Sequence, residues 1–471
     1  FAIAAVFGLN HHKNKVLLRQ KERAAQEQQL ALENVVKVYD QRLDKEETHT
    51  DQKISETVKH KEEFSSEKSS SDNADTTLGA DAPPPGQTAD LSGAASYVTD
   101  KIFTHKGGVW AARYSPLQFP ALPGYVSAFL ITASRDHTAG IWDMRGDKDF
   151  FLRGHTAEIN DATFNPKPPA DGNGWFAATA SDDNTAALWR ASEPNKPLPL
   201  KGHSAAVTGL AWSANGNWLV TTSKDSQVRI WNVAAADPSK QSRVLQGHSA
   251  SVWLPCLMET GGAGWLVTPS ADNTARVWTF PRGEPASFSK HAEPGVLHHG
   301  APVRRVAMDS KARWVVTAGA DGRAILWDRV SGELLLILNH EKPVRDVAFQ
   351  PGGNLLVTAS ADNTAQIWDA QKLSPIVTLA GHTAPIFSAR FTPYGPGVVT
   401  VSWDRTARLW NYETKKCVAV LRGHVDALWS VEFSPSGNNF TTTSSDGTAR
   451  LWELERIPGG SVFVRPPASA K

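Results

Sequence analysis

From about residue 97 onward, short apolar runs alternate with polar turns at regular intervals. In one stretch, Val344–Phe349 alternates apolar and polar residues, Leu355–Ser360 follows a Gln-Pro-Gly-Gly-Asn turn, and residues 365–368 form a third run. A fourth run, residues 375–382, precedes the next copy. A period of two with Gly, Pro and Asn between the runs is typical of strands joined by tight turns. The pattern predicts repeating units of four antiparallel strands.

The unit recurs eight times and always carries a His, an Asp and a Trp. The His-to-Trp spacing is 28 residues in five copies and 37, 34 and 30 in the others, and this regularity excludes chance. An apolar residue follows each His by four positions. The eight sets, in order, are His105, Asp136 and Trp142; His155, Asp183 and Trp189; His203, Asp225 and Trp231; His248, Asp272 and Trp278; His299, Asp321 and Trp327; His340, Asp362 and Trp368; His382, Asp404 and Trp410; and His424, Asp446 and Trp452.

With these repeats, the chain resembles the WD-repeat β-propeller family over about residues 97–464. The resemblance implies an all-β fold: an eight-bladed propeller of four-stranded antiparallel blades, over residues 96–471. It also implies that the His, a Ser or Thr, the Asp and the Trp of each copy form a hydrogen-bonded tetrad. A buried His or carboxylate is costly unless it is paired, which agrees with such a network.

Two segments are candidates for the strand that closes the ring. Residues 99–105 align with the strand that precedes His424, whereas residues 460–466 lie at a suitable distance after Trp452. The sequence does not choose between them. A seven-bladed ring with one displaced repeat is the alternative to eight blades.

The first 95 residues have a different composition and are expected to form three parts. Residues 1–10 are an apolar segment followed by basic residues, either the end of a transmembrane helix with the rest on the cytoplasmic side, or an apolar helix of a missing domain. Residues 11–47 predict a helical stalk, either a weakly self-associating coiled coil or a solvated helix. Residues 48–95 are too polar to bury a core and predict a disordered linker.

This layout resembles bacterial WD-repeat proteins in which an N-terminal signalling module, a STAND-type NTPase or a Ser/Thr kinase, precedes the propeller. The resemblance implies that such a module would lie before residue 1. It rests on layout alone and is therefore an analogy.

The composition argues against several classes of function. Lys plus Arg is 49 and Asp plus Glu is 48, so the net charge of +1 gives no basic excess for nucleic acid. Two cysteines form neither a disulfide framework nor a zinc cluster. We find no phosphate-binding loop, nucleophile elbow or metal-binding His motif, so we predict no catalytic residues, no metal, no cofactor and no enzyme activity.

The family resemblance places three positions of each repeat on one face of the ring. They follow the His by three and by five residues and precede the tetrad Asp. Trp and Arg, which are enriched in interface hot spots, gather at these positions from the fifth repeat round to the first. The predicted partner-binding residues are Trp110, Arg135, Arg304, Arg345, Phe387, Trp403 and Trp429.

We therefore predict a non-enzymatic scaffold, cytoplasmic or at the cytoplasmic face of a membrane, that binds a peptide or protein segment with apolar and acidic groups. The structural alternative is that the Trp side chains fill the wide mouth of the ring. Two functional alternatives stay open. One is the sensor region of a larger signalling protein, which would grip its own missing N-terminal domain, and the other is a small-ligand binder in the central channel.

Overall fold

The computed structural model describes residues 94–99, 101–116, 129–144, 149–167, 175–190, 192–260, 262–280, 295–456 and 462–464. The predicted apolar segment 1–10, the stalk 11–47 and all but the last two residues of the linker 48–95 lie outside these residues. The membrane tether, the stalk self-association and the cytoplasmic location stay predictions. Among the described residues, no helix is long and apolar enough to cross a membrane.

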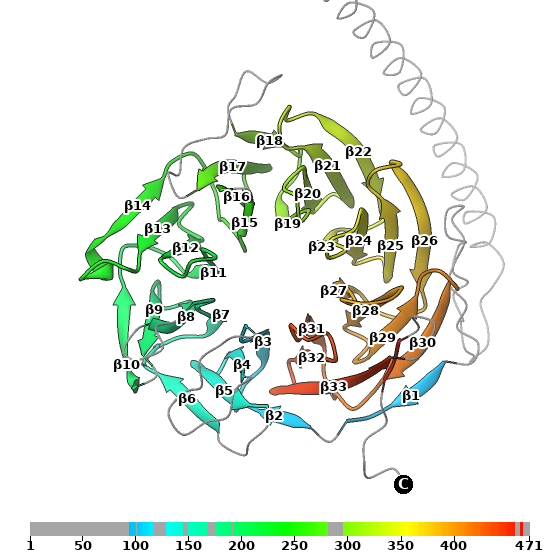
Figure 1. Ribbon diagram of the computed structural model, residues 1–471, viewed down its shortest axis with the longest axis horizontal. Coiled ribbons are helices and arrows are strands. Elements are labelled where there is room, and N and C mark those ends of the chain that lie inside the picture. The colour runs from blue at the N-terminus through cyan, green and yellow to red at the C-terminus, as the bar shows by residue number, and fades with distance from the viewer. Residues whose placement is uncertain are drawn as a thin grey trace, which may run out of the picture. The chain divides into compact units, whose positions relative to one another are not determined.

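The described residues form eight antiparallel sheets around a common axis, which is the arrangement of a β-propeller (Figure 1). We number these blades in chain order, and the first strand of each blade lies nearest the axis. Blades 1 and 2 consist of β3 (Val109–Tyr114), β4 (Phe129–Ser134), β5 (Thr138–Asp143) and β6 (Asp149–Arg153), and of β7 (Ile159–Phe164), β8 (Trp175–Ser181), β9 (Ala186–Arg190) and β10 (Glu193–Leu200). Blades 3 and 4 consist of β11 (Val207–Trp212), β12 (Trp218–Ser223), β13 (Val228–Asn232) and β14 (Ser242–Leu245), and of β15 (Cys256–Thr260), β16 (Ala263–Pro269), β17 (Thr274–Phe280) and β18 (Val296–His298).

The second half of the ring repeats the same order of strands. Blades 5 and 6 consist of β19 (Val303–Met308), β20 (Trp314–Gly319), β21 (Arg323–Asp328) and β22 (Leu334–Asn339), and of β23 (Val344–Phe349), β24 (Leu355–Ser360), β25 (Thr364–Asp369) and β26 (Ser374–Ala380). Blades 7 and 8 consist of β27 (Ile386–Phe391), β28 (Gly397–Ser402), β29 (Ala407–Asn411) and β30 (Lys416–Leu421), and of β31 (Leu428–Phe433), β32 (Asn439–Ser444) and β33 (Thr448–Arg456). A short 3-10 helix, η1 (Pro238–Lys240), precedes β14. The eight-bladed, all-β prediction is confirmed.

The N-terminal side of the chain closes the ring. Strand β2 (Ile102–Thr104) pairs antiparallel with β33 and becomes the fourth strand of blade 8. The preceding strand, β1 (Ala95–Tyr97), lies parallel to β30 on the outside of blade 7. The C-terminal candidate, β34 (Val462–Val464), pairs only with the far end of β33, at residues 454–456. The second closure hypothesis is therefore wrong, although this segment does form a strand.

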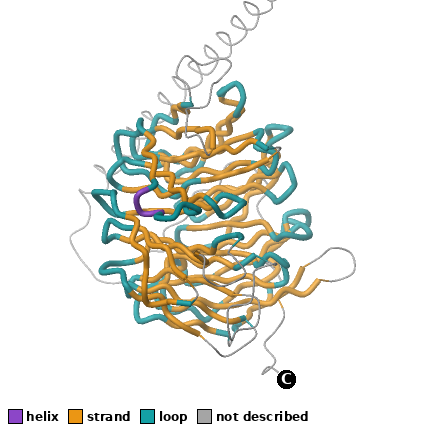
Figure 2. Tube along the Cα trace, turned by 60° about the vertical axis from the view of Figure 1, so that its left-hand side comes forward, coloured by secondary structure: helices purple, strands orange, loops and turns teal. Residues whose placement is uncertain are grey.

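The hydrophobic core lies between neighbouring sheets. One cluster joins blades 1 and 2 through Ile141, Phe176 and Trp189, all of them buried, and similar clusters join the later blades. Because each sheet is covered on both faces, the middle strands are buried along their length, such as β4, in which every residue is buried. Figure 2 shows the strands stacked side by side, with the loops at their ends.

Blade 4 departs from the repeat in its first strand. Pro255 has no backbone N–H to donate, and β15 begins only after it, at Cys256. A single bridge between Val252 and Ser270 holds the segment before the proline. Blade 4 nevertheless has the same order of four strands as the other blades.

Candidate functional site

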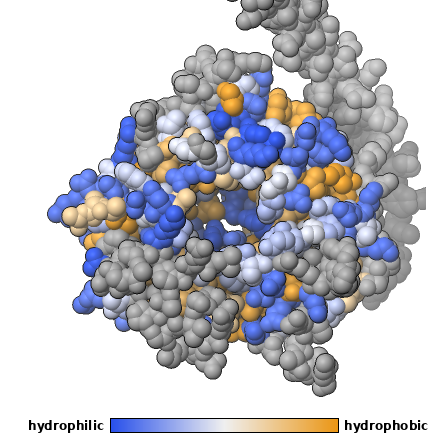
Figure 3. All heavy atoms as spheres, in the orientation of Figure 1, coloured by the Kyte–Doolittle hydropathy of each residue, from blue (hydrophilic) through white to orange (hydrophobic). Residues whose placement is uncertain are grey.

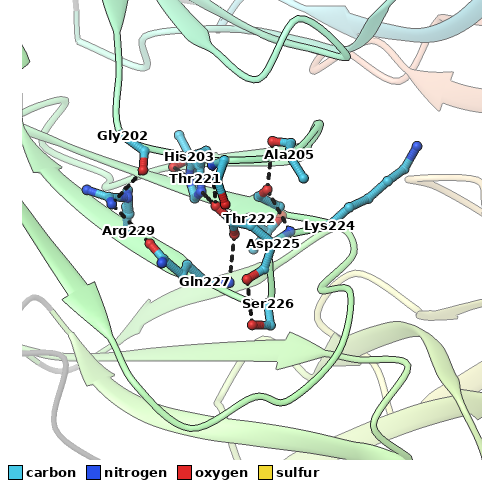
Figure 4. Close-up of polar contacts among 12 residues, drawn as sticks. Gly202, His203, Ala205, Thr221, Thr222, Lys224, Asp225, Ser226, Gln227 and Arg229 are labelled. Carbon is cyan, nitrogen blue, oxygen red and sulfur yellow. Dashed lines mark hydrogen bonds and ion pairs between the residues drawn. The ribbon is translucent and has the colours of Figure 1, made fainter.

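The His, Asp and Trp of each repeat meet around a threonine. In blade 3, His203 Nδ1 lies 2.9 Å from Asp225 Oδ2, and His203 Nε2 lies 2.8 Å from Thr221 Oγ1 (Figure 4). Trp231 Nε1 donates to the same threonine oxygen at 3.0 Å. The indole only donates, and among the contacts of the Thr221 hydroxyl the one available acceptor is His203 Nε2, so we infer that the hydroxyl donates to Nε2 and that the ring proton lies on Nδ1, facing the aspartate.

The same four-residue arrangement occurs in all eight repeats. Sequence reasoning did not locate the hydroxyl residue, although a threonine ten positions before each Trp marks it. The eight threonines are Thr132, Thr179, Thr221, Thr268, Thr317, Thr358, Thr400 and Thr442.

The fifth blade holds the same four residues with its imidazole turned over. His299 contacts Thr317 through Nδ1, at 2.8 Å, and Asp321 through Nε2, at 3.3 Å. Position 319 is Gly where the other seven blades have Ser, and a Cβ there would collide with the His299 ring. Arg323 takes the free oxygen of Asp321. The missing side chain is therefore what allows the flipped ring.

The ionisation of the tetrads is that of a structural network. Burial opposes the charged form of Asp136, but hydrogen bonds from His105 and Thr138 outweigh it and hold the pKa of this carboxyl well below its usual range. Burial lowers the pKa of His203 and His424 despite their aspartates. A neutral, buried imidazole with both nitrogens bonded has no free lone pair for a substrate.

A β-bulge sets the orientation of the residue five positions after the tetrad His. In every blade except blade 4, the pairing between the first two strands skips that residue, as between Val207 and Gly209. A bulged residue leaves the ladder and its side chain is re-aimed. The skipped residues are Trp110, Asn160, Thr208, Arg304, Arg345, Phe387 and Trp429. They share one face of the ring with the tetrad-Asp turns, and we call it the top face.

Four aromatic side chains of the top face pack on one another, and we call them the aromatic cluster. Phe387 stacks on Trp403, with ring centroids 4.8 Å apart, and meets Trp429 edge to face at 4.8 Å. Trp429 in turn contacts Trp110 at 4.9 Å. Trp403 is 43% exposed, which makes it a large apolar surface in contact with water. The cluster joins blades 7, 8 and 1.

Two of the three predicted arginines lie over aromatic rings, one of them within this cluster. The guanidinium carbon of Arg345 lies 5.2 Å from the Phe387 ring centroid, and that of Arg304 lies 5.2 Å from the ring of Trp253. Arg135 behaves differently, because its Nε donates to Glu158 Oε1 of the next blade at 2.8 Å. The structure thus brings six of the seven predicted residues into one region, while Arg135 is engaged in its own ion pair.

A cavity of about 300 Å³ opens between the inner strands below these side chains. Five of the predicted residues line it: Trp110, Arg304, Arg345, Phe387 and Trp429. The space-filling view shows the ring hollowed at its centre (Figure 3). Arg113, Asp161 and Arg305 also line the cavity and were missed by sequence reasoning. Trp253 lines it too; it lies at one of the predicted positions, five residues after His248, but was not among the predicted partner-binding residues. Within the described ranges, no group of three or more His, Cys, Asp or Glu side chains could hold a metal.

Buried ion pairs connect the inner strands around this cavity. Asp346 accepts from Arg305 Nε at 3.0 Å and from Ser388 Oγ at 2.7 Å. Burial opposes its ionisation, but Arg390 and Arg305 together hold the pKa of Asp346 below its usual range. Asp161 has the weaker partner, Arg113, at 3.6 Å, and burial raises its pKa. The Arg113–Asp161 pair joins blades 1 and 2, and the contacts of Asp346 join blades 5, 6 and 7.

The family model described as "WD domain, G-beta repeat" matches residues 146–190, 195–232, 294–328, 332–369, 373–411 and 415–453. A solved structure with the same fold is the computationally designed Ika8 protein, with a TM-score of 0.59 and 21% identity, over 76% of this chain and 99% of that one. At this identity the likeness concerns the fold alone.

Several curated proteins share part of the repeat region. The nuclear distribution protein PAC1 of Ajellomyces capsulatus is 28% identical over 154 residues, 32% of this chain and 31% of that protein. Transcription initiation factor TFIID subunit 5 of Caenorhabditis elegans is 32% identical over 167 residues, 35% of this chain and 22% of that protein. The matched segment thus spans less than a third of either relative.

Proposed function

The chain belongs to the WD40 repeat family, and from that premise we propose that its propeller is a non-catalytic scaffold that recognises a peptide or protein segment on the top face. One relative is by its printed name a subunit of a larger factor, transcription initiation factor TFIID subunit 5, which supports an interaction role. The observation that carries the proposal is the aromatic cluster, with the half-exposed Trp403 at its outer side.

The composition of this region is that of an interface centre. Trp and Arg are the residues whose truncation most often costs an interface 2 kcal/mol or more. Here one indole is already in water at Trp403, backed by the rings of Phe387 and Trp429, so covering it would remove apolar surface at little cost in side-chain order. Along blades 2 and 3, by contrast, Asp182 accepts a hydrogen bond from Asn160 Nδ2 at 2.7 Å and forms an ion pair with Lys224 at 3.7 Å. Those polar groups already satisfy one another.

The test compares two tryptophan variants of the full chain. Trp403→Ala removes the exposed ring, whereas Trp314→Ala removes a ring at the opposite end of the second strand, where it lies 3.9 Å under Arg313. Proteins that each variant retains from a cell extract are compared with those of the wild type by mass spectrometry. We expect at least one protein that Trp314→Ala still retains and Trp403→Ala does not. The melting temperature of Trp403→Ala should equal that of the wild type.

Two results would contradict the proposal. A partner that binds equally to Trp403→Ala would place recognition elsewhere on the molecule. A large fall in the melting temperature of Trp403→Ala would favour the alternative in which the rings only fill the mouth of the ring.

A further inference from the structure

The wall of the central cavity carries more positive than negative side chains. Its charged lining consists of Arg113, Arg304, Arg305, Arg345 and Asp161. Arg113 is paired with Asp161, and Arg305 is paired with Asp346, which Arg390 also contacts. In the part of the chain that the structure describes, Arg304 and Arg345 form no ion pair and donate no hydrogen bond. Two guanidinium charges therefore meet at the cavity without a counter-ion.

The two free arginines are close enough to disturb each other. Burial, and next the positive charge of Arg304, lower the pKa of Arg345. Arg345 Nε is shielded from solvent and has no acceptor, and the same holds for Trp110 Nε1. An anion placed here would relieve the repulsion and accept these donors.

The other polar groups of the wall are already occupied. Asn160 donates to Asp182 and to the carbonyl of Val207, and Thr208 donates to the carbonyl of Val252. Ser388 donates to Asp346, and Ser430 pairs with Thr443. The spare hydrogen-bonding capacity of the wall is thus concentrated in the two guanidinium groups and in the indole N–H groups of Trp110 and Trp253.

A cationic ligand does not suit this site. Aromatic cages hold cations with the open faces of their rings, but here Arg345 lies over Phe387 and Arg304 lies over Trp253. A bound cation would have to displace one arginine and then face the other.

We propose that the cavity is a carboxylate subsite: an Asp or Glu side chain of the bound peptide inserts between Arg304 and Arg345, while a nearby apolar side chain of the same peptide covers Trp403. This assignment rests on the proposed top-face function and specifies its ligand. The guanidinium fork matches the two oxygens of a carboxylate. A phosphate dianion fits less well, because the carboxylate of Asp161 lines the same cavity and would repel it.

The geometry also limits the spacing of the two groups. The Arg345 guanidinium lies 5.2 Å from the Phe387 centroid, which lies 4.8 Å from that of Trp403, so the two subsites are at most about 10 Å apart. An extended peptide advances about 3.4 Å per residue. The acidic and the apolar residue should therefore lie within about three positions of each other.

The experiment uses arrays of hexapeptides probed with the labelled full chain. Each peptide holds one Glu, Gln or phosphoserine, and one Leu placed one to five positions away. The variants are Arg304→Gln, the double variant Arg304→Gln/Arg345→Gln, and Trp403→Ala. The matched control is Arg153→Gln, because Arg153 also lies 5.2 Å over a ring, that of Phe151, but on an outer strand.

We expect the wild type and Arg153→Gln to prefer Glu over Gln by about tenfold or more, with Leu within three positions. Both arginine variants should lose that preference and still bind the Gln peptides, which also shows that they are folded. Trp403→Ala should weaken binding to Glu and Gln peptides alike.

The outcomes separate the subsite from the function on which it rests. Binding that depends on Trp403 but ignores Glu against Gln would overturn the subsite and leave the proposed function standing. Preference for phosphoserine that depends on the arginines would overturn the carboxylate assignment. Binding of N-acetylglutamate alone as tightly as of the peptides would overturn the two-part peptide ligand in favour of a small acid. No binding to any peptide would contradict both proposals.

Discussion

At the scale of single residues, the tetrad threonine holds each blade together through one oxygen. In blade 3, Thr221 is fully buried, accepts from Trp231 Nε1 and donates to His203. We expect Thr221→Val to lower the free energy of unfolding by about 2–4 kcal/mol, because it preserves shape but strands one buried donor and one buried acceptor. Urea unfolding measures the loss.

The control for this prediction is the same substitution at a threonine whose side chain is exposed to solvent. Thr414 lies in the turn between β29 and β30, in contact with solvent, so Thr414→Val should change stability by no more than about 0.5 kcal/mol. Equal effects of the two substitutions would mean that the tetrad hydroxyl adds nothing beyond an ordinary surface group.

At the scale of elements, closure of the ring depends on the pairing of three residues of β2 with three residues of β33. Phe103 fixes this strand, because its ring packs 5.2 Å from that of Trp142 in blade 1. We expect Phe103→Ala to cost about 2–3 kcal/mol and to speed hydrogen exchange at residues 448–450. Val98→Ala, at a residue that is 53% exposed in the same segment, should do neither. Faster exchange confined to residues 454–456 would instead indicate closure through β34.

The strands themselves could be predicted from the sequence almost to the residue. Val344–Phe349 and Leu355–Ser360 were expected and are β23 and β24, because turn residues and a period of two mark both ends of each strand. Ring closure was not predictable, because residues 99–105 and 460–466 have equally strand-like patterns and only packing against Trp142 separates them. The interruption of blade 4 has a visible signal in Pro255, which the repeat alignment hid.

The candidate site was predictable in its positions but not in its pairing. Spacing from the His located the bulged residues, since seven of the eight blades repeat the same bulge. It could not show that Arg135 is engaged by Glu158 from the next blade, or that Asp346 neutralises Arg305 and leaves Arg304 and Arg345 free. Such pairings join residues on different blades, and no local pattern records them.

At the scale of the whole molecule, eight similar blades produce a top face with two unlike parts. Around blades 1 to 3, polar side chains pair across blades, as Arg135 does with Glu158 and Lys224 with Asp182. From blade 5 round to blade 1, aromatic rings and free arginines take the same positions. Because all eight blades share the tetrad, the residue five positions after its His can differ from blade to blade within the same fold, and we expect the proposed recognition to use the aromatic side of the ring.

Four of the tetrad histidines and the tetrad aspartates make the stability of the ring depend on pH. Burial lowers the pKa of His203, His299, His382 and His424 below the ordinary value of 6.5, even though each faces an aspartate that favours the charged form. The unfolded chain therefore binds more protons than the native one once the pH falls below about 6.5, and stability must decrease with falling pH there. The tetrad aspartates act in the same direction. Their pKa values in the folded protein lie below the ordinary 3.8, so below about pH 4 the unfolded chain binds protons that the native chain does not, and stability falls further.

We accordingly expect the free energy of unfolding to be flat above about pH 7, to decline from about pH 6.5 and to fall more steeply below about pH 4. Urea midpoints measured at constant ionic strength from pH 8 to pH 3 test this course. Stability that instead rises between pH 6.5 and 5 would show that the imidazoles become charged within the native ring, as ion pairs with their aspartates. The neutral Trp–Thr–His–Asp chain inferred for the tetrads would then be wrong, since it requires an unprotonated imidazole nitrogen facing the threonine, which is Nε2 in His203 and Nδ1 in His299.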